Sequence, residues 1–489
     1  MKRNILLFVL MIITNSLFAQ ANPPALQMIR NEDLKSDLYA LADAHFKGRS
    51  AGTLDELKAG MWLAEKYRAI GLKPAGDGGT YFQFFTLWRN HIDDNSIIAI
   101  NNTPLQLWKD AAVSQMANIT LQAPVVYLGN AADIDLEKVD VTGKIIAIEA
   151  NAKNINLNVS LPTWRYSRYI FTKYGAPLIQ RGAAAIIFIA DDVAERAWDD
   201  AVENFKRGTY DIDGGANENV RTTVPVIWVH ANAKKLLQQD NATIKANIIV
   251  ARYPYPSVNV VGKMDGTDAE LKKEYVLYSG HIDAHGIRDV IKNDSIFYGA
   301  DDNGSVDVAM LANARAFVKN PSRRSVLFII HGAEERGLLG STYFSQHPTV
   351  PIKNIVAVLN GDMIGRNNTD SAAMLGSIPP HRNSLELVNM ALAANREGPN
   401  FKLDTAWDKP SHIEGWYFRS DHLPYARLGI PSIMYTSLLH NDYHTPQDNA
   451  ANINYPKLKK MADWMYRTGW KVANAPVRPA TDKDFKLER

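Results

Sequence analysis

The chain has 489 residues, 54 basic and 52 acidic side chains for a formal net charge of +2, and no cysteine. This length exceeds what one hydrophobic core usually organises, so we expect two or more folding units. The near-neutral balance provides no broad basic field, which argues against nucleic acid as a partner. Without cysteine there is no disulfide, no thiolate nucleophile and no Cys-based zinc site, so His and carboxylate side chains remain as metal ligands.

Residues 1–19 have the pattern of a cleavable secretory signal peptide. Lys2-Arg3 precedes the apolar run Ile5–Ile13, and the small residue Ala19 follows. An uncleaved anchor is disfavoured, because the run is shorter than the roughly 20 apolar residues that span a bilayer. We therefore expect a periplasmic or secreted protein whose mature chain has no integral membrane segment.

The first clear element along the mature chain is a helix over residues 54–70, which ends at the Gly71 and Pro74 stop signal. From about 116 to 250 the pattern changes to short strands separated by turns, without a close set of histidines and acids. Tyr253-Pro-Tyr-Pro256 is typical of a stiff return linker. We expect 116–250 to be an inserted, β-rich domain.

Beyond the insert, strand patterns alternate with helical patterns at 305–318, 384–395 and 456–471. This alternation is typical of a layered α/β domain. We expect residues 26–115 and 251–475 to form one discontinuous domain, with a mixed, mainly parallel sheet flanked by helices. The Lys-rich tail, 476–489, is expected to be loosely held.

Histidines and acids follow the apolar runs of this second half. The run Tyr275–Gly280 is followed by His281, and Ser325–Ile330 is followed by Glu334 and Glu335. Ile355–Leu359 is followed by Asp362, and Ile433–Tyr435 comes before His444. In an open α/β sheet the loops at the carboxyl ends of parallel strands meet at one crevice. The pattern most simply predicts a two-zinc hydrolase with five metal ligands: His281, Asp302, Glu335, Asp362 and His444.

The neighbours of these ligands have structural as well as functional interpretations. Asp283 shares one side of an extended segment with His281, so its carboxylate could orient the imidazole. Asp302 could equally cap the helix that follows. Function is favoured at Glu334 and Glu335, because adjacent acids beside an apolar core repel unless a cation or a functional proton holds them.

The order of the motifs resembles the co-catalytic zinc aminopeptidase and glutamate carboxypeptidase superfamily. The motifs are His281-x-Asp283, Gly299-Ala-x-Asp-Asn303, Ala333-Glu-Glu335, Asn360-x-Asp-Met363, Ser420-Asp-His422 and Tyr443-His-x-Pro446. Three further segments are similar to the N-terminal part and the re-entry strand of the family: Phe46–Gly52, Gly71–Pro74 and Asn259–Gly262. Val139–Lys144 and Arg181–Ile186 resemble the protease-associated domain that is often inserted in these enzymes. The resemblance covers about 26–475.

Carried over by motif, the resemblance implies one zinc ion at His281 and Asp362 and the other at Glu335 and His444. Asp302 would bridge the two ions. The family places the bridging acid at the second Asp of Gly-Ala-Asp-Asp, so Asp301 is expected to cap or support the loop. Val306 and Gly361 depart from the family pattern, which usually has Gly and an apolar residue at these positions.

The chemistry expected of such a centre is hydrolysis. Two zinc ions roughly 3.5–4 Å apart can hold a water molecule, lower its pKa and polarise a scissile carbonyl. Glu334 would act as the general base that passes the proton to the leaving amine. Tyr443 would donate a hydrogen bond to the developing oxyanion, unless it only packs.

The remaining polar residues are expected to have no part in catalysis. We expect His285–Asp294 to form a surface loop in preference to a substrate-facing rim, and Asp421 to have at most a supporting role. The histidines outside the predicted set are expected to be hydrogen-bonding or surface residues: His285, His331, His412, His422 and His440.

Substrate choice depends on a single comparison. Superfamily enzymes that remove acidic C-terminal residues carry arginines soon after a Gly-Ile-x-Ser turn, whereas Gly429–Ser432 is followed by Ile433–Tyr435. We therefore expect an exported aminopeptidase that acts on peptides. It would bind two Zn²⁺ ions per chain. The insert would screen substrate size or form part of the cleft rim.

Three alternatives remain open. A carboxypeptidase or dipeptidase of the same superfamily would keep every metal residue and differ in the cleft lining. A glutaminyl cyclase of related fold would bind one zinc ion, and a receptor-like binding protein would be non-catalytic. Cobalt or manganese would also suit His and carboxylate ligands.

Overall fold

The computed structural model describes residues 22–153, 165–217, 222–412 and 414–487. The predicted signal peptide lies outside these ranges. Among the described helices, none is both long and apolar enough to cross a membrane.

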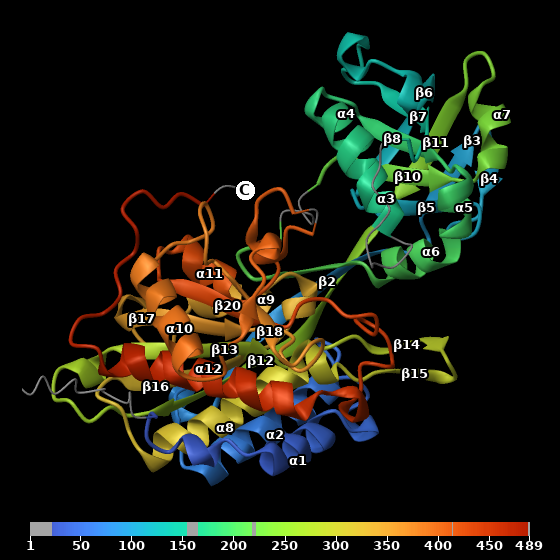
Figure 1. The fold of residues 1–489 in the computed structure, drawn as a ribbon. Coiled ribbons are helices and arrows are strands. Elements are labelled where there is room, and N and C mark those ends of the chain that lie inside the picture. The colour runs from blue at the N-terminus through green and yellow to red at the C-terminus, as the bar shows by residue number, and fades with distance from the viewer. Residues whose placement is uncertain (1–21, 154–164, 218–221, 413, 488–489) are drawn as a thin grey trace, which may run out of the picture.

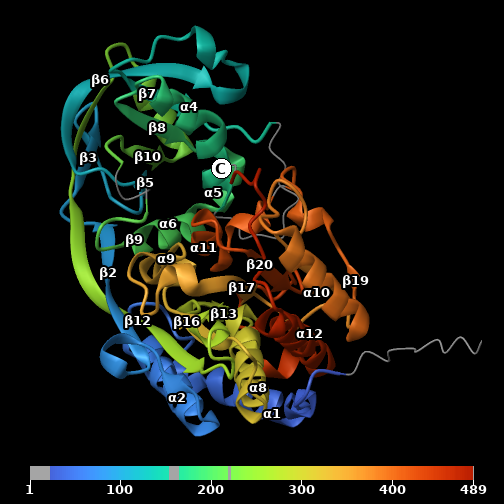
Figure 2. The same ribbon diagram turned by 90° about the vertical axis from the view of Figure 1, so that its left-hand side faces the viewer.

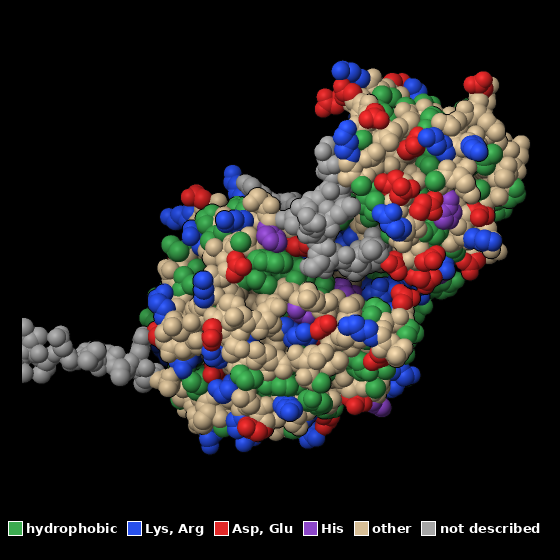
Figure 3. Space-filling view, turned by 45° about the vertical axis from the view of Figure 1, so that its right-hand side comes forward, with side chains coloured by type: hydrophobic (Ala, Val, Ile, Leu, Met, Phe, Trp, Pro, Cys, Tyr) green, Lys and Arg blue, Asp and Glu red, His purple; other side chains and the backbone are tan. Residues whose placement is uncertain are grey.

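The described chain forms two units, each built around its own sheet (Figure 1). Figure 2 shows that the smaller unit stands beyond one end of the larger and is joined to it by two long strands, β2 (Phe82–Ile92) and β12 (Val250–Met264). In the space-filling view the units are separate lobes that meet across a narrow hollow (Figure 3).

The larger unit contains a ten-stranded mixed sheet. Its four central strands are parallel, and antiparallel strands flank them on both sides. In sheet order the remaining strands are β19 (Lys402–Leu403), β18 (Ser371–Leu375), β20 (Ser432–Thr436), β17 (Ile355–Gly361), β13 (Tyr275–His281) and β16 (Ser325–His331) before β12 and β2, with β9 (Thr209–Ile212) last and β1 (Lys73–Pro74) beside β12.

The central strands are mostly apolar, with buried residues pointing to both sides, because helices cover both faces of the sheet. On β13, Val276 and Tyr278 belong to one core cluster and Leu277 to the cluster on the opposite face. The first face is covered by α1 (Asn31–Leu41), α2 (Leu54–Ile70), α8 (Val306–Lys319), α10 (Leu385–Glu397) and α12 (Tyr455–Asn474), and the second by α9 (Leu339–Gln346) and α11 (His422–Arg427). This is the mixed α/β fold that the sequence predicts.

The smaller unit has an eight-stranded mixed sheet with core clusters on both faces. Its strands in sheet order are β4 (Thr103–Leu105), β3 (Ile97–Ile100), β11 (Thr243–Ile248), β6 (Ile119–Asn130), β7 (Ile145–Glu149), β8 (Ala185–Ile189), β10 (Val226–Val229) and β5 (Ala111–Gln115). Its helices are α3 (Arg165–Ile170), α4 (Ala176–Gln180), α5 (Asp192–Arg196), α6 (Trp198–Arg207) and α7 (Lys234–Leu237).

The sequence analysis places the start of the insert at residue 116, but the smaller unit begins earlier in the chain. Strands β3, β4 and β5 precede that position and belong to the smaller sheet. Conversely, β9 lies within the expected insert but pairs with β2 at the edge of the large sheet. The exchange of strands between units follows long-range pairing, which strand-length patterns do not encode.

The expected proline linker is part of a strand. Residues 253–256 pair with β2 in an antiparallel ribbon that runs from Val250↔Ile92 to Val260↔Phe82. Alternate residues of such a strand point their amide positions away from the partner, so Pro254 and Pro256, two residues apart, need no donor.

The predicted helices occur close to the predicted bounds. α2 begins after Thr53, whose hydroxyl accepts from the Glu56 amide, and ends at Gly71 with a φ of 96°. The helices predicted at 305–318, 384–395 and 456–471 correspond to α8, α10 and α12. The loosely held tail is wrong for its described part, because the Asp482 carboxylate accepts from the Leu385 amide at 2.9 Å and from Arg382 Nε at 3.0 Å at the start of α10.

Candidate metal centre

The predicted ligands lie where the central parallel strands end. His281 is the last residue of β13, Glu335 follows β16, and Asp362 follows β17 directly. Asp302 lies in the turn before α8, and His444 lies in the loop between β20 and α12. The carboxyl ends of adjacent parallel strands thus bring together residues that are far apart in the chain.

Two groups of side chains could each hold a cation. The first ligand group is His281, Asp302 and Asp362, all buried, and the second ligand group is His285, Glu335 and His444. Each residue offers one ring nitrogen or carboxylate oxygen, and within each group these atoms all lie within 4.8 Å of one another.

Asp302 connects the two groups through its two carboxylate oxygens. Oδ1 lies 3.3 Å from His281 Nε2, and Oδ2 lies 3.1 Å from His444 Nε2. His444 Nε2 is also 3.2 Å from Glu335 Oε1, while His281 Nε2 is 3.9 Å from Asp362 Oδ2. A carboxylate with one oxygen toward each group has the arrangement of a bridging ligand.

His285 was expected to be a hydrogen-bonding or surface residue, and the structure places it in the second ligand group. Its Nε2 lies 3.3 Å from Glu335 Oε1, and only 10% of its side chain is exposed. The sequence signal for it was weak, because an additional histidine four residues after a ligand occurs equally in surface loops.

The donor set fits divalent cations. Zinc binds His nitrogen and carboxylate oxygen at about 2.0–2.2 Å, which places neighbouring donors of a tetrahedron roughly 3.4 Å apart. Among the described residues, His281 Nε2 and Glu335 Oε1 are buried without a hydrogen-bond partner. Burial, reinforced by Asp302, raises the pKa of Asp362 to about 8, so the cluster binds protons where no cation balances it.

A comparison with protein families bears on this centre. Residues 259–468 match the model of Peptidase family M28. This match covers less than half of the chain and supports the co-catalytic zinc peptidase superfamily that the motifs resemble. The matched segment contains every residue of both ligand groups.

Relatives by sequence support the same assignment. Aminopeptidase YwaD of Bacillus subtilis (strain 168) is 26% identical over 270 residues, 53% of this chain and 54% of that protein. A probable zinc metalloprotease of Pyrenophora tritici-repentis is 24% identical over 299 residues, 52% of this chain and 60% of that protein. The matches thus span little more than half the length of these relatives.

Solved structures share the fold. An aminopeptidase from Aneurinibacillus sp. strain AM-1 has a TM-score of 0.58 at 18% identity, covering 95% of this chain and 99% of that one. The zinc aminopeptidase BSAP from Bacillus subtilis has a TM-score of 0.55 at 18% identity, covering 94% and 99%. The fold that these structures share with this chain therefore extends over both of its units.

Glu334, the predicted base, lies beside the first ligand group of this centre. Its Oε2 is 3.7 Å from His281 Nε2, and its side chain is 9% exposed. Burial raises the pKa of Glu334 well above its ordinary value; His281 opposes this rise and Glu335 reinforces it. The carboxyl group is thus placed to exchange protons within the centre.

The carboxylate of Asp283 binds the turn that carries Glu334 and Glu335, and it does not bind the His281 ring. Its two carboxylate oxygens accept hydrogen bonds from the amides of Glu334 at 2.9 Å and Glu335 at 3.1 Å. The carboxylate is 3.8 Å from His281 Nδ1, beyond hydrogen-bond reach, and the backbone carbonyl of Asp283 faces that nitrogen at 3.1 Å. The expected orienting role of the carboxylate is therefore corrected, since two amides already hold it.

Two further acids hold the loop that carries Asp302. Asp448, which the sequence analysis did not single out, accepts from the amides of Asp301 at 2.8 Å and Asp302 at 3.1 Å. Asp301 accepts from the Gly365 amide at 2.6 Å. Asp301 thus supports the loop, as expected, and links it to the segment after Asp362.

Left-handed backbone conformations occur at residues next to the ligands. Ala333, Met363 and His444 have φ values of 54°, 53° and 55°. Such conformations cost non-glycine residues on the order of 1 kcal/mol or more, and they concentrate at functional sites. The turns that aim the ligands are therefore maintained by the surrounding packing.

The two departures from the family pattern compensate each other. A Cβ atom at Gly361 would lie 2.9 and 3.0 Å from the two methyl groups of Val306, closer than real Cβ atoms pack. Val306 is fully buried at the start of α8. The larger residue at 306 therefore requires the smaller one at 361.

Tyr443 lies against the centre with its hydroxyl toward the cleft. Its ring stacks on His444 at 3.6 Å between centroids, and its hydroxyl accepts a hydrogen bond from Arg419 Nη2 at 3.1 Å. Burial raises the pKa of Tyr443 well above 10, so the hydroxyl keeps a proton that it can donate.

A cleft of about 810 Å³ opens above the centre and is lined by both units. Its floor is formed by Glu334 and by the members of the two ligand groups other than His281, while the smaller unit contributes residues of α3 and α6. The hairpin of β14 (Gly286–Ile291) and β15 (Asp294–Phe297) also lines it, so the expected surface loop is in fact a rim. Six arginines surround the floor: Arg165, Arg168, Arg207, Arg288, Arg336 and Arg419.

The other predicted bystanders lie outside the two groups. His331 is a buried structural residue that contacts Asn259 Oδ1 and the Tyr425 hydroxyl, both at 3.2 Å. His440 lies 3.4 Å from Asp301, and His412 packs on Trp407. Asp421 and His422 are fully buried at the start of α11.

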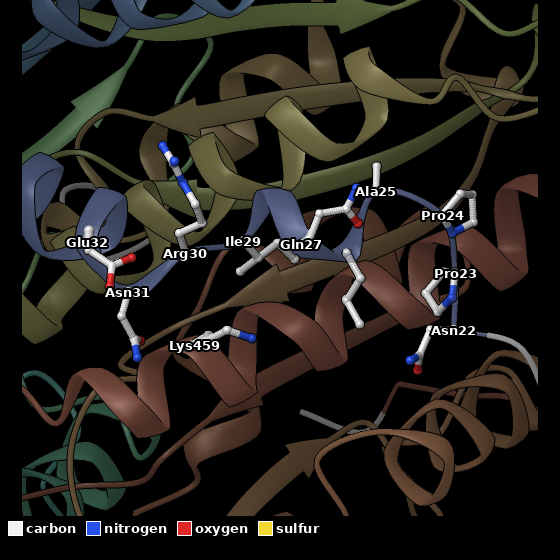
Figure 4. A pocket seen from close by; sticks show the side chains of 11 residues that line it. Asn22, Pro23, Pro24, Ala25, Gln27, Ile29, Arg30, Asn31, Glu32 and Lys459 are labelled. Carbon is white, nitrogen blue, oxygen red and sulfur yellow. The ribbon is translucent and has the colours of Figure 1, made fainter.

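A second hollow, of about 680 Å³, is lined by residues 22–32 without Met28 and by Lys459 of α12. Figure 4 shows this N-terminal segment running along α12. Its lining contains a single carboxylate, Glu32, and no histidine, so it offers no comparable metal-binding group.

Proposed function

We propose that this protein is an exported zinc aminopeptidase with two metal ions. The observation that carries the proposal is the shared Asp302, which offers one oxygen to each ligand group on the floor of the cleft, with Glu334 alongside. The names of a relative and of a solved structure, both aminopeptidases, support the aminopeptidase part of the proposal.

Each of these residues would have a distinct role. His281 and Asp362 would hold one zinc ion, Glu335 and His444 would hold the other, and Asp302 would bind both ions. When bound, such ions polarise a carbonyl and lower the pKa of water. Glu334 takes a proton from the attacking water and returns it to the leaving amine, while the Tyr443 hydroxyl donates to the carbonyl oxygen.

Export is proposed from the first residues alone. Lys2-Arg3 followed by Ile5–Ile13 and Ala19 has the features of a cleaved signal peptide. We assign the smaller unit as a protease-associated domain on the resemblance of Val139–Lys144 and Arg181–Ile186. Its α3 and α6 line the cleft, which supports a role in substrate access.

One observation favours a carboxypeptidase or dipeptidase instead. The six arginines around the cleft could bind a substrate carboxylate near the scissile bond. The aminopeptidase remains our conclusion because the guanidinium nearest Tyr443 is already engaged: Arg419 Nη1 donates to Glu414 at 3.1 Å. Ile433–Tyr435, where the acid-specific enzymes carry arginines, are buried in β20.

The test is hydrolysis of matched peptides by the zinc-loaded mature protein. Each sequence is offered with both ends free, with an acetylated N-terminus and with an amidated C-terminus. An aminopeptidase loses activity only on acetylation, whereas loss on amidation alone indicates a carboxypeptidase and loss on both indicates a dipeptidase. No cleavage of any peptide overturns the proposal.

A further inference from the structure

His285 is fixed in place by the backbone around it. The Ala284 amide donates to the Arg49 carbonyl at 3.3 Å, and the Gly286 amide donates to the Gly48 carbonyl at 2.9 Å. Gly286 has a φ of 76°, and a Cβ at Gly48 would collide with the Phe297 carbonyl oxygen. The imidazole is therefore held between two pinned residues at the edge of the second ligand group.

The distances around His285 are those of donors that share one cation. Its Nε2 lies 3.3 Å from Glu335 Oε1, and that oxygen lies 3.2 Å from His444 Nε2. His444 Nε2 lies 3.1 Å from Asp302 Oδ2. Neighbouring donors of a tetrahedral zinc ion are roughly 3.4 Å apart. The donor atoms of His285, Glu335 and His444 all lie within 4.8 Å of one another, and Asp302 adjoins them through His444.

The hydrogen bonding of His285 differs from that of a structural histidine. Within the described chain, both ring nitrogens are buried without a partner, and so is Glu335 Oε1. Leaving such a group unpaired destabilises the folded protein. His331 is equally buried but has a partner at each nitrogen.

Unpaired nitrogens alone do not single out His285, because His422 and His440 share them. The difference is what each ring faces. His440 faces Asp301, which supports the loop and belongs to neither ligand group. His422 packs against the Tyr417 ring, whereas His285 meets His444 at 3.8 Å between ring centroids, at an angle of 79°, with Glu335 between their nitrogens. Two imidazoles that converge on one carboxylate form a ligand set.

We propose that His285 is a ligand of the second metal ion, together with Glu335, His444 and the bridging Asp302. This deepens the proposed function and rests on its two-ion centre. Four protein donors complete a tetrahedral shell, whereas the first group offers three. The open position would then belong to the first group, where Glu334 Oε2 lies 3.7 Å from His281 Nε2.

The inference predicts unequal metal binding after removal of one imidazole. Chelator-treated wild type, His285→Ala and His285→Gln are titrated with Co²⁺, and binding is followed by calorimetry and by the visible absorption of the ion. Both variants are expected to bind one of the two ions, that of the second ligand group, about 10–100-fold less tightly than wild type does, as metal sites respond to loss of supporting residues. The other ion should keep its affinity.

Two further variants serve as controls, one that should lose affinity for the second ion and one that should not. His444→Ala, which removes a ligand that the proposed function requires, should also weaken the second ion. His347→Ala changes an exposed histidine that contacts the Tyr343 carbonyl and should bind both ions as wild type does. Melting of the metal-free proteins shows whether each variant is folded.

Crystals of the zinc-loaded wild type give a readout that needs no variant. The inference predicts His285 Nε2 about 2.0–2.1 Å from an ion. It is overturned if that distance exceeds about 3 Å, or if both variants bind two ions with wild-type affinity. A wild type that binds fewer than two ions contradicts the two-ion centre of the proposed function as well, so the two failures are distinguishable.

Discussion

Side chains of the larger unit form the floor of the cleft, and side chains of the smaller unit form part of its wall. The floor is made of buried acids and histidines whose positions are fixed by backbone amides, as Asp283 and Asp448 show. The wall from α3 and α6 consists of polar side chains, three of which are arginines. The comparison teaches that the reaction and the choice of substrate should respond to mutations in different units.

The largest effect is expected at Glu334. Glu334→Gln removes the group that moves the proton, so kcat should fall by about 10²–10⁴-fold while both metal ions stay bound. Glu137→Gln, an exposed change on the smaller unit, is the matched control and should leave kcat unaltered. Steady-state kinetics with metal analysis checks this, and a variant that keeps more than a tenth of the wild-type kcat would refute the role.

The next effect separates two adjacent acids. Asp302→Asn should weaken metal binding by about 100-fold or more, because its two oxygens face the two ligand groups. Asp301→Asn should keep both ions but lower the melting temperature, since Asp301 accepts the Gly365 amide. Equal metal loss in both variants would show that the assignment of the bridging acid is wrong.

A stability effect is expected on the floor of the cleft. Gly361→Ala should destabilise the metal-free protein by about 1–3 kcal/mol, because the new methyl group meets Val306. In a Val306→Ala background the cost should fall by about 0.5–3 kcal/mol. Denaturant unfolding measures this coupling, and Val308→Ala, also buried in α8, provides the additive control. Additivity in both pairs would contradict the compensation.

The smallest effect is expected in the wall. Arg207→Gln should raise KM about two- to fivefold for short peptides with a free C-terminal carboxylate or a downstream acidic side chain, with kcat unchanged. Amidated peptides and peptides with Gln in place of Glu distinguish the two carboxylates. Arg196→Gln, an exposed arginine that does not line the cleft, is the control. A fall in kcat would mean that the smaller unit takes part in the reaction itself.

The sequence predicts the floor better than the wall for a physical reason. Ligands at the ends of apolar strands are recognisable because His281 and Asp362 directly terminate or follow buried segments. Roles that depend on distant partners are not recognisable: Asp283 meets amides 51 and 52 residues away, and Asp448 meets amides 146 and 147 residues away.

The same reason explains the errors outside the floor. His285 and the hairpin after it have the polarity of a surface loop, whereas the structure places them on the cleft that α6 also lines. Strand β3 is short and pairs with β11, more than 140 residues later, so its sheet could not be assigned locally. The departures at Val306 and Gly361 were visible in the sequence, but their compensation required the packing.

The most direct test of the two-ion floor is an anomalous difference map of the zinc-loaded crystal, measured on both sides of the zinc absorption edge. The account predicts two peaks about 3.5–4 Å apart, one beside each carboxylate oxygen of Asp302. A single peak, or two peaks that do not share Asp302, would contradict it.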